Sequence, residues 1–309
     1  MMQSATLFCV GTRRFRGRNA LSLPEAGEQT GVGAMKKVAI VGLGWLGMPL
    51  AISLLARGYQ VVGSKTQPDG VEAARMSGIE CYQLNLTPLP EADPDDLAAL
   101  FQADALIITL PASHTVEGAD NYFLAVQQVV DSALAAAVPR IIFTSSTSVY
   151  GEGPGVKREE SPTTPCSPAG MCLVELENWL HQLPHTSVDI LRLAGLVGPG
   201  RHTGRFLAGK QGLQGGGQGV NLVHLADVIS AITLLLQRPR GGHRYNLCAP
   251  GHPAKRDYYP AMAWALGVAP PVYLADRGAC EGKIIDGSRI CKELGFDYLY
   301  PDPAFMPLA

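Results

Sequence analysis

The segment that most constrains this chain is the glycine-rich run at residues 42–47, which reads GLGWLG and has the spacing G-x-G-x-x-G. It follows the apolar run 38–41 and begins a stretch in which Leu46, Leu50 and Leu54 recur at helical spacing. In a strand, turn and helix of this kind, the three glycines permit the tight turn, the approach of a pyrophosphate and close packing of the helix on the strand. The N–H groups at the helix start, which carry about half a positive charge, then hold the phosphates. The run therefore predicts a dinucleotide-binding site.

The same region raises the question of a membrane span. Residues 38–56 carry no charge, and their length is close to the roughly 20 apolar residues that cross a bilayer. Gly42, Gly44 and Gly47 favour a strand, a tight loop and a helix instead, so no membrane association is predicted. Lys and Arg number 25 against 27 Asp and Glu, and the net charge is −2. This balance does not indicate a nucleic-acid partner, which requires clustered positive charge.

The fold class follows from short β-branched runs that alternate with longer helical stretches after Met35. With 47% hydrophobic residues the chain can bury a large core. The alternation predicts an α/β fold, a doubly wound parallel sheet (Rossmann fold) with a small C-terminal substrate lobe. Strands are predicted at 38–41, 59–63, 105–110, 140–145 and 188–195, and the clearest helices at 119–137 and 172–181.

Three regions are predicted along the chain. Residues 1–34 are Arg-rich and without sustained periodicity, and are interpreted as a disordered leader or non-native extension before Met35, with a cleaved transit segment as the alternative. Residues 35–200 are predicted to form the NAD(P)-binding Rossmann domain. Residues 201–309 are predicted to complete the sheet and form the small substrate lobe, with a mobile glycine-rich loop at 209–219.

Cysteine and histidine usage points to a cytoplasmic protein without a metal site. The seven cysteines form no C-x-x-C pair and leave an odd count, which is typical of reduced thiols. His181 and His185 have the i, i+4 spacing of a helical metal pair, but Pro184 lies between them and should end the helix. No metal site is predicted.

The residues after the second predicted strand bear on the type of dinucleotide. An acidic residue is expected there to bind the ribose 2′-hydroxyl of NAD, whereas a cation accommodates the 2′-phosphate of NADP. The chain has Ser64 and Lys65 at this place. NADP is therefore the predicted cofactor, with NAD as the alternative.

Later motifs carry a resemblance to a known family. The run FTSSTSVYG at 143–151 resembles the fifth-strand motif of the extended short-chain dehydrogenase/reductase superfamily, which includes nucleotide-sugar epimerases and dehydratases. Further matches follow in order at 191–201, 221–232, 245–251 and 288–296, and together they resemble an atypical bacterial branch of this superfamily. The glycine run with ITLP at 108–111 also resembles β-hydroxyacid dehydrogenases, but the region after residue 160 lacks the lysine motif of that group.

The resemblance implies a catalytic Ser or Thr together with a Y-x-x-x-K pair that moves a proton. Ser146 matches the serine position, but none of the ten tyrosines has Lys four residues later. When Glu177 is aligned with the acidic residue of the corresponding helix in the superfamily, the positions of the Tyr and the Lys fall on Ala169 and Leu173. Tyr150 is the nearest candidate to replace the missing catalytic Tyr, and the alternative is that it only packs in the fold. For Ser146 the alternative to catalysis is that it caps the following turn or binds the cofactor.

The substrate side also departs from the family pattern. An Arg that holds the diphosphate of nucleotide sugars is replaced by Val220, although Arg201 and Arg205 could supply charge. His224 and Asp227 match the family's V-H-x-x-D motif and are interpreted as structural.

Two functions are consistent with these features: an NAD(P)-binding oxidoreductase or epimerase/dehydratase-type enzyme on a small or sugar-like substrate, and a non-catalytic NAD(P)-binding, redox-sensing protein. The expected partners are the dinucleotide and an unknown small-molecule substrate, and the expected state is a monomer or homodimer. The predicted cofactor contacts are Gly42, Gly44, Trp45, Leu46, Gly47, Ser64, Lys65, Leu110, Pro111 and Ser145, and the candidate catalytic residues are Ser146 and Tyr150.

Overall fold

The computed structural model describes residues 37–87, 89–112, 119–275 and 282–308, all within one compact unit, Ala34–Ala309. The prediction for residues 1–34 lies outside the described residues. Within the described ranges, no helix is both long enough and apolar enough to cross a membrane.

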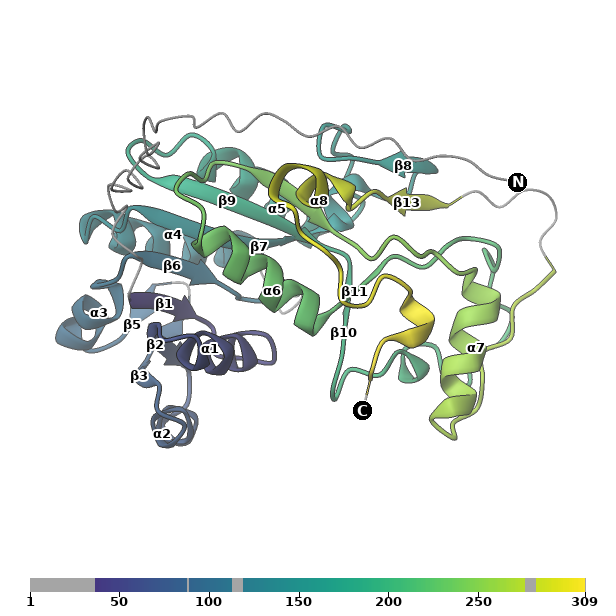
Figure 1. Ribbon diagram of the computed structural model, residues 1–309, viewed down its shortest axis with the longest axis horizontal. Helices are drawn as coiled ribbons and strands as arrows, with labels where there is room; N and C mark the ends of the chain where they lie inside the picture. Colours follow the sequence, from purple (N-terminus) through teal and green to yellow (C-terminus); the bar gives the residue numbers. More distant parts are fainter. Residues whose placement is uncertain (1–36, 88, 113–118, 276–281, 309) are drawn as a thin grey trace, which may run out of the picture. The chain divides into compact units, whose positions relative to one another are not determined.

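A seven-stranded sheet forms the centre of the unit (Figure 1). Its strand order is β3-β2-β1-β6-β7-β9-β12, and every neighbouring pair is parallel. The predicted α/β Rossmann architecture is therefore confirmed, and the carboxyl ends of all seven strands share one edge, where ligands bind in such sheets. The strands are β1 (Lys37–Val41), β2 (Gln60–Lys65), β3 (Glu80–Gln83), β6 (Ala105–Ile108), β7 (Arg140–Ser146), β9 (Ser187–Leu193) and β12 (Arg244–Leu247).

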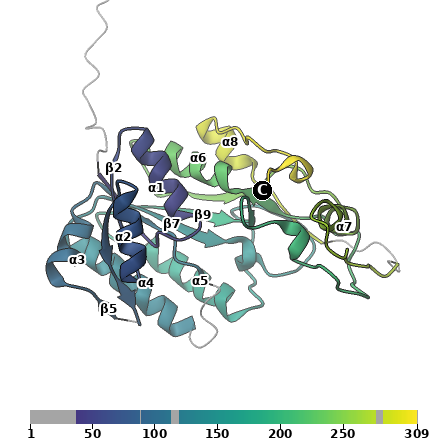
Figure 2. The same ribbon diagram turned by 90° about the horizontal axis from the view of Figure 1, so that it is seen from below.

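Helices cover both faces of this sheet. Figure 2 shows α1, α6 and α8 on one face and α3, α4 and α5 on the other. The connections β1-α1-β2 and β6-α4-β7 are the parallel crossovers that the alternating sequence pattern predicts. The helices are α1 (Gly47–Ala56), α2 (Pro68–Met76), α3 (Pro94–Phe101), α4 (Ala119–Ala135), α5 (Pro168–Leu180), α6 (Leu225–Leu236), α7 (Lys255–Ala265) and α8 (Ser288–Leu294).

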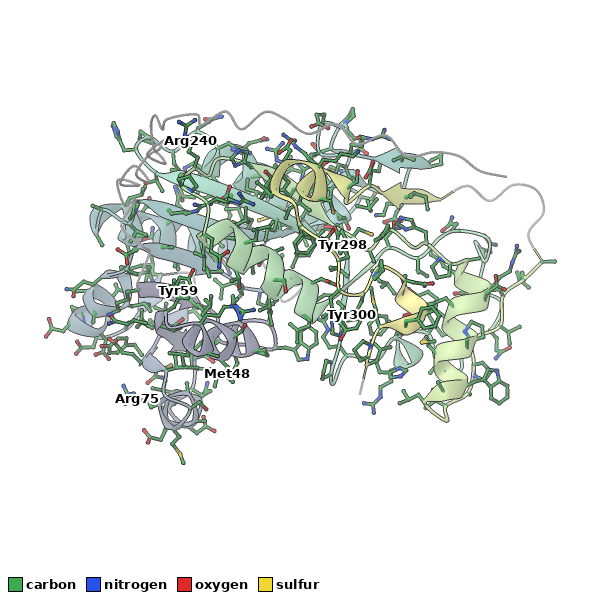
Figure 3. All side chains as sticks on the ribbon, viewed as in Figure 1. Met48, Tyr59, Arg75, Arg240, Tyr298 and Tyr300 are labelled. Carbon is green, nitrogen blue, oxygen red and sulfur yellow. The ribbon has the colours of Figure 1, made fainter. Side chains whose placement is uncertain are left out.

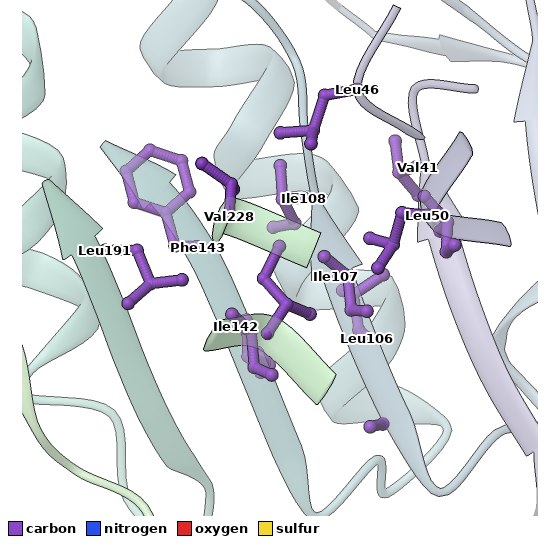
Figure 4. Close-up of a cluster of buried hydrophobic side chains, with 14 of the residues drawn as sticks. Val41, Leu46, Leu50, Leu106, Ile107, Ile108, Ile142, Phe143, Leu191 and Val228 are labelled. Carbon is purple, nitrogen blue, oxygen red and sulfur yellow. The ribbon is translucent and has the colours of Figure 1, made fainter. Parts of the chain in front are cut away.

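The main core lies between the sheet and these helices. Strands β1, β6 and β7 are buried on both faces, which explains their continuous apolar sequences. Leu46 and Leu50 at the start of α1 and Val228 of α6 pack over Ile107 and Ile142 from the sheet (Figure 4). The helix that follows the glycine run is therefore fixed by the same residues whose spacing predicted it.

The C-terminal part forms a smaller lobe with a core of its own. It contains the parallel pair β10 (Gly195–Val197) and β11 (Leu222–His224), the helix α7 and the one-turn helices η3 (Thr203–Arg205) and η4 (Pro303–Phe305). A second parallel pair joins β8 (Gly155–Lys157) to β13 (Lys283–Ile285). Two short elements lie outside the lobe. The antiparallel pair β4 (Asn85–Leu86) and β5 (Pro90–Glu91) follows β3, and the one-turn helix η2 (Thr147–Tyr150) follows β7. The core of the lobe consists of Val197, Val220, Leu222, Ala249, Tyr258, Met306 and Leu308.

The V-H-x-x-D residues tie the C-terminal segment to α6. The His224 ring accepts a hydrogen bond from the Ala226 N–H at Nδ1 and donates from Nε2 to the carbonyl oxygen of Pro307 at 2.9 Å. Asp227 is fully buried and accepts the N–H of Leu299 at 2.6 Å. Tyr300 packs edge-on against His224 at 4.4 Å between ring centroids, close to α6 (Figure 3).

The predicted loop at 209–219 makes backbone hydrogen bonds to two other segments. The N–H of Leu213 donates to the carbonyl oxygen of Val272, and residues 272 and 274 donate back to the carbonyl oxygens of residues 210 and 213. The N–H groups of Lys255 and Arg256 donate to the carbonyl oxygens of residues 218 and 216. The loop therefore has backbone partners far along the chain, which its glycine-rich composition does not indicate, and its mobility stays a prediction.

Gly47 is the glycine whose missing side chain the fold requires most. A Cβ atom at this position would lie 2.2 Å from the carbonyl oxygen of Gly42 and 3.0 Å from Thr109 Oγ1. The Gly42 oxygen is itself fixed by a hydrogen bond from Thr109 at 2.6 Å. The helix can approach β1 this closely only because residue 47 has no side chain.

We therefore expect Gly47→Ala to lower the free energy of unfolding by about 3 kcal/mol, since backbone must move to relieve the overlap. Gly44→Ala is the matched control, because its Cβ would meet nothing closer than 4.0 Å, and its stability should remain within about 0.5 kcal/mol of the parent. Urea unfolding followed by circular dichroism measures both. Equal stabilities for the two variants would contradict this account of the glycine contact.

Candidate functional site

The turn between β1 and α1 leaves several backbone donors without partners. Gly42 has φ +101°, which a residue with a side chain adopts at a cost, and the Gly44 N–H closes the turn on the Gly42 carbonyl oxygen at 2.7 Å. Within the described residues, the N–H groups of Trp45, Leu46 and Gly47 donate to no other backbone group, and α1 has neither a side-chain cap nor an acid in its first turn. Three unpaired N–H donors at a helix start can bind an anionic group, and this place is called the anion site below.

The tip of this turn is held in place from two neighbouring strands. The N–H of Leu43 donates to the Ser64 carbonyl oxygen at 3.0 Å, and Ser64 Oγ accepts the Gly42 N–H at 3.4 Å. From the other side, Thr109 Oγ1 donates to the Gly42 carbonyl oxygen. Sequence reasoning missed Thr109, which lies just after β6, although its place in a strand followed by Leu-Pro was a usable signal.

A cavity of about 540 Å³ opens at this turn, along the carboxyl ends of β1, β2 and β6. Its lining includes six of the ten predicted cofactor contacts and residues that sequence reasoning did not select. The six are Gly42, Gly44, Ser64, Lys65, Leu110 and Pro111. The additional lining residues include Leu84, Asn85, Leu86, Thr87, Asn121, Tyr122 and Ala125. A correct third-strand prediction would have placed the first four of these at the same sheet edge.

The chemistry of the cavity suits a flat base flanked by polar groups. Half of its lining side chains are aliphatic, and among the described residues that line it Lys65 is the only charged one. Tyr122 is buried and donates its hydroxyl to the Leu110 carbonyl oxygen at 2.9 Å, which joins α4 to the end of β6. Burial raises the pKa of Tyr122, so its hydroxyl stays protonated at neutral pH.

The remaining four predicted contacts lie outside this lining. Leu46 and Gly47 are buried at the start of α1, and the N–H group of each has no backbone acceptor among the described residues. The Trp45 side chain turns toward the small lobe and donates from Nε1 to the Pro199 carbonyl oxygen at 2.7 Å. Ser145 is buried and donates its hydroxyl to Glu177 at 2.6 Å.

Ser146 ends β7 at the carboxyl edge of the sheet, and its side chain is half-buried. Its Oγ accepts the N–H of Ser148 at 3.1 Å and so caps η2. This bond uses an acceptor lone pair of the hydroxyl and leaves its O–H free to donate. Capping and donation to a ligand oxygen are therefore compatible at this serine.

A buried polar network lies behind Ser146, between β9, β12 and α5. Arg192, about 1% exposed, binds both carboxylate oxygens of Glu177, with Nη2 to Oε2 at 2.6 Å and Nε to Oε1 at 3.0 Å. Arg192 Nη1 also donates to the Tyr150 hydroxyl at 2.7 Å, and its guanidinium lies 4.9 Å from the centre of the Tyr150 ring. The Tyr150 hydroxyl in turn donates to Asn246 Oδ1 at 2.7 Å.

Tyr150 is fully buried inside this network. Burial raises the pKa of its phenol above the ordinary value, although the neighbouring Arg192 acts in the opposite direction. At neutral pH the phenol is therefore protonated, and both its proton and its acceptor side are occupied by Asn246 and Arg192. The structure thus joins Tyr150 to the sheet interior and not to the cavity lining.

The positions aligned with the superfamily's Tyr and Lys carry apolar side chains on α5. Ala169 is half-buried and Leu173 is 2% exposed, two turns and one turn before Glu177. Val220, at the place of the diphosphate-binding Arg, is buried in the core of the small lobe. In the described part of the chain, no three His, Cys, Asp or Glu side chains gather as they would around a metal ion.

Comparison with known proteins agrees with this architecture. Residues 38–248 match the family model of the NAD dependent epimerase/dehydratase family. The chain belongs to this family. Protein YeeZ of Escherichia coli K12 is 65% identical over 274 residues, which cover 89% of this chain and all of that protein. The predicted superfamily, and its atypical bacterial branch, are thereby confirmed, and the β-hydroxyacid dehydrogenase alternative is set aside.

Solved structures of other proteins share the fold at lower identity. A functionally unknown conserved protein from Silicibacter pomeroyi is 26% identical, with a TM-score of 0.67 over 87% of this chain and 95% of that chain. UDP-glucose 4-epimerase from Thermus thermophilus, in complex with NAD, is 20% identical, with a TM-score of 0.69 over 85% of this chain and 94% of that chain. At this identity the second likeness shows the fold alone.

Glu177→Gln tests the buried network. Losing the carboxylate charge leaves the Arg192 guanidinium buried without a counterion, and we expect the free energy of unfolding to fall by about 3–5 kcal/mol. Glu160→Gln is the matched control, since Glu160 is exposed and pairs with Arg289 at the surface, and it should change stability by less than about 1 kcal/mol. Chemical denaturation at pH 7 measures both, and a loss for Glu177→Gln no larger than that of the control would show that the pair is not structurally required.

Proposed function

We propose that this protein binds NADP(H) in the cavity beside α1 and catalyses hydride transfer on a small or sugar-like carbonyl or alcohol, as an oxidoreductase or epimerase/dehydratase-type enzyme. The supporting observation is a cavity that opens at the glycine turn, next to three N–H groups at the start of α1 that have no backbone partner among the described residues. Among the described residues that line the cavity, Lys65 carries the one charged side chain. The family description names NAD as the dinucleotide, and the Thermus epimerase binds NAD. The bound nicotinamide would supply the hydride acceptor or donor.

Lys65 supports the choice of NADP over NAD. It is the last residue of β2, where a carboxylate would accept hydrogen bonds from the ribose 2′-hydroxyl of NAD. An ammonium group here instead attracts a 2′-phosphate, and no acid among the described lining residues opposes it.

Ser146 is the proposed contact to the reacting oxygen of the substrate. Its free O–H, at the end of β7, can donate to a carbonyl oxygen and so stabilise the negative charge that develops there during reduction. A side-chain proton donor of the usual Tyr-Lys type is absent from positions 169 and 173. A positioned acid contributes about 10²–10⁴-fold, so turnover should be slow compared with enzymes that have the pair.

A second candidate function, a non-catalytic nucleotide-binding or redox-sensing protein, is supported by the same apolar replacement. Leu173 is buried and Tyr150 is enclosed in the network, so neither position offers a proton carrier near Ser146. The two functions share the cofactor site and differ only in whether hydride reaches a substrate.

Cofactor choice is tested with Lys65→Ala. We expect NADPH affinity to fall about tenfold, corresponding to the loss of one charge-assisted contact, while NADH affinity changes less than about twofold. Lys37→Ala, which removes a cation at the opposite end of the neighbouring strand β1, should change neither. Isothermal titration calorimetry measures all three proteins, and NADH binding at least as tight as NADPH in the parent would refute the NADP assignment.

Catalysis is tested with Ser146→Ala in an NADPH-oxidation assay over a panel of aldehydes, ketoses and keto acids. We expect kcat to fall about 10²-fold with cofactor affinity unchanged, since the hydroxyl acts on the developing oxyanion. Ser148→Ala removes a hydroxyl from the same turn and serves as the control. Tight NADPH binding without turnover on any member of the panel would instead support the non-catalytic function.

A further inference from the structure

Trp45 connects the phosphate-binding turn to the small lobe. It lies between Gly44 and the start of α1, and its indole packs on the segment 198–201 that follows β10. The indole N–H donates to the Pro199 carbonyl oxygen, and a Cβ atom on Gly198 would lie 3.4 Å from Cη2 of the indole. The lobe and the anion site are therefore in direct contact through this one side chain.

The Trp45 ring also positions the guanidinium group of Arg201. The guanidinium carbon of Arg201 lies 5.0 Å from the centre of the Trp45 ring, a cation–π arrangement. Arg201 is exposed, and in the described residues no carboxylate forms an ion pair with it and no side-chain hydrogen bond occupies its donors. The Arg201 guanidinium thus stacks on the Trp45 ring while its N–H groups remain available to a ligand.

The strand, turn and helix that form the anion site supply no cation of their own. Residues 38–56, which form the strand, the turn and the helix, carry no charged side chain. A pyrophosphate placed on the N–H groups of residues 45–47 would bring two negative charges to the start of α1, and Lys65 lies on the neighbouring strand at the sugar end of the site. Arg201 is the cation that Trp45 holds next to this turn, and a guanidinium matches the geometry of phosphate oxygens.

We propose that Arg201 is a cofactor-binding residue whose guanidinium, presented on the indole of Trp45, pairs with the pyrophosphate of the dinucleotide. This inference rests on the proposed function, since it requires a dinucleotide at the start of α1. The pairing draws residues 198–201 of the small lobe into the cofactor site. It also gives a role to the Trp45 side chain. The G-x-G-x-x-G spacing places no requirement on this residue, which lies between Gly44 and Gly47.

The test is Arg201→Met, which keeps an apolar stem over Trp45 and removes the charge. We expect the dissociation constants of NADPH and of ADP-ribose, both of which contain the pyrophosphate, to rise about five- to twentyfold, with AMP binding unchanged. Arg201→Lys should recover part of the loss. Arg205→Met is the matched control, because Arg205 is exposed on the same segment and its loss should alter affinity less than about twofold. Calorimetry at two salt concentrations should show a smaller salt dependence for Arg201→Met than for the parent.

The outcomes separate this inference from the proposed function. If the parent binds neither NADPH nor ADP-ribose, the proposed function fails. If the parent binds both tightly and Arg201→Met binds them as well as Arg205→Met does, only the assignment of Arg201 is overturned. An unchanged cofactor affinity with a raised KM for anionic carbonyl substrates would place Arg201 on the substrate and would also overturn it. Equal thermal unfolding of the variants and the parent confirms that affinity, not folding, is compared.

Discussion

The buried ion pair of Arg192 on β9 and Glu177 on α5 is the interaction on which the carboxyl ends of β7, β9 and β12 depend. Arg192 is directly opposite Ser145 on β7 and Asn246 on β12, so these three side chains lie side by side on one face of three neighbouring strands. A charge in this position costs several kcal/mol unless it is paired and hydrogen-bonded. Glu177, Tyr150 and the Glu159 carbonyl oxygen together satisfy the guanidinium. The pair therefore fixes α5 and η2 against the strand ends, and with them the position of Ser146.

This network explains how the fold can persist without the superfamily's proton-transfer pair. Ala169 and Leu173 lie on the same helix as Glu177, and the helix is held to the sheet by the carboxylate and by buried residues such as Leu176 and Leu180. Neither a Tyr nor a Lys at the two positions is needed to keep α5 in place. Architecture and chemistry are thus separable here, which is why the fold likeness to an epimerase does not by itself transfer its reaction.

The sequence predicted what depends on local pattern and missed what depends on distant partners. The glycine turn and the five predicted strands agree with the structure because their signals lie within a few residues. Helix α5 begins at Pro168, four residues before its prediction, because the Ser167 hydroxyl accepts the Gly170 N–H and starts the helix on a proline. The surroundings of Tyr150 could not be predicted, since its partners Arg192 and Asn246 lie 42 and 96 residues away. The same holds for the cavity lining contributed by α4.

The small lobe is joined to the nucleotide turn at more than one level. Asp227 anchors the backbone of the C-terminal segment to α6, and His224 anchors Pro307 at the end of β11. Helix α6 lies beside α1 on the same sheet face (Figure 2), and β11 pairs with β10, whose end leads directly to the segment that receives Trp45. Two packed elements and one side-chain hydrogen bond therefore connect the turn to the lobe. Because these links join the same two regions at separate points, the lobe and the glycine turn belong to one compact unit and not to two separately packed domains.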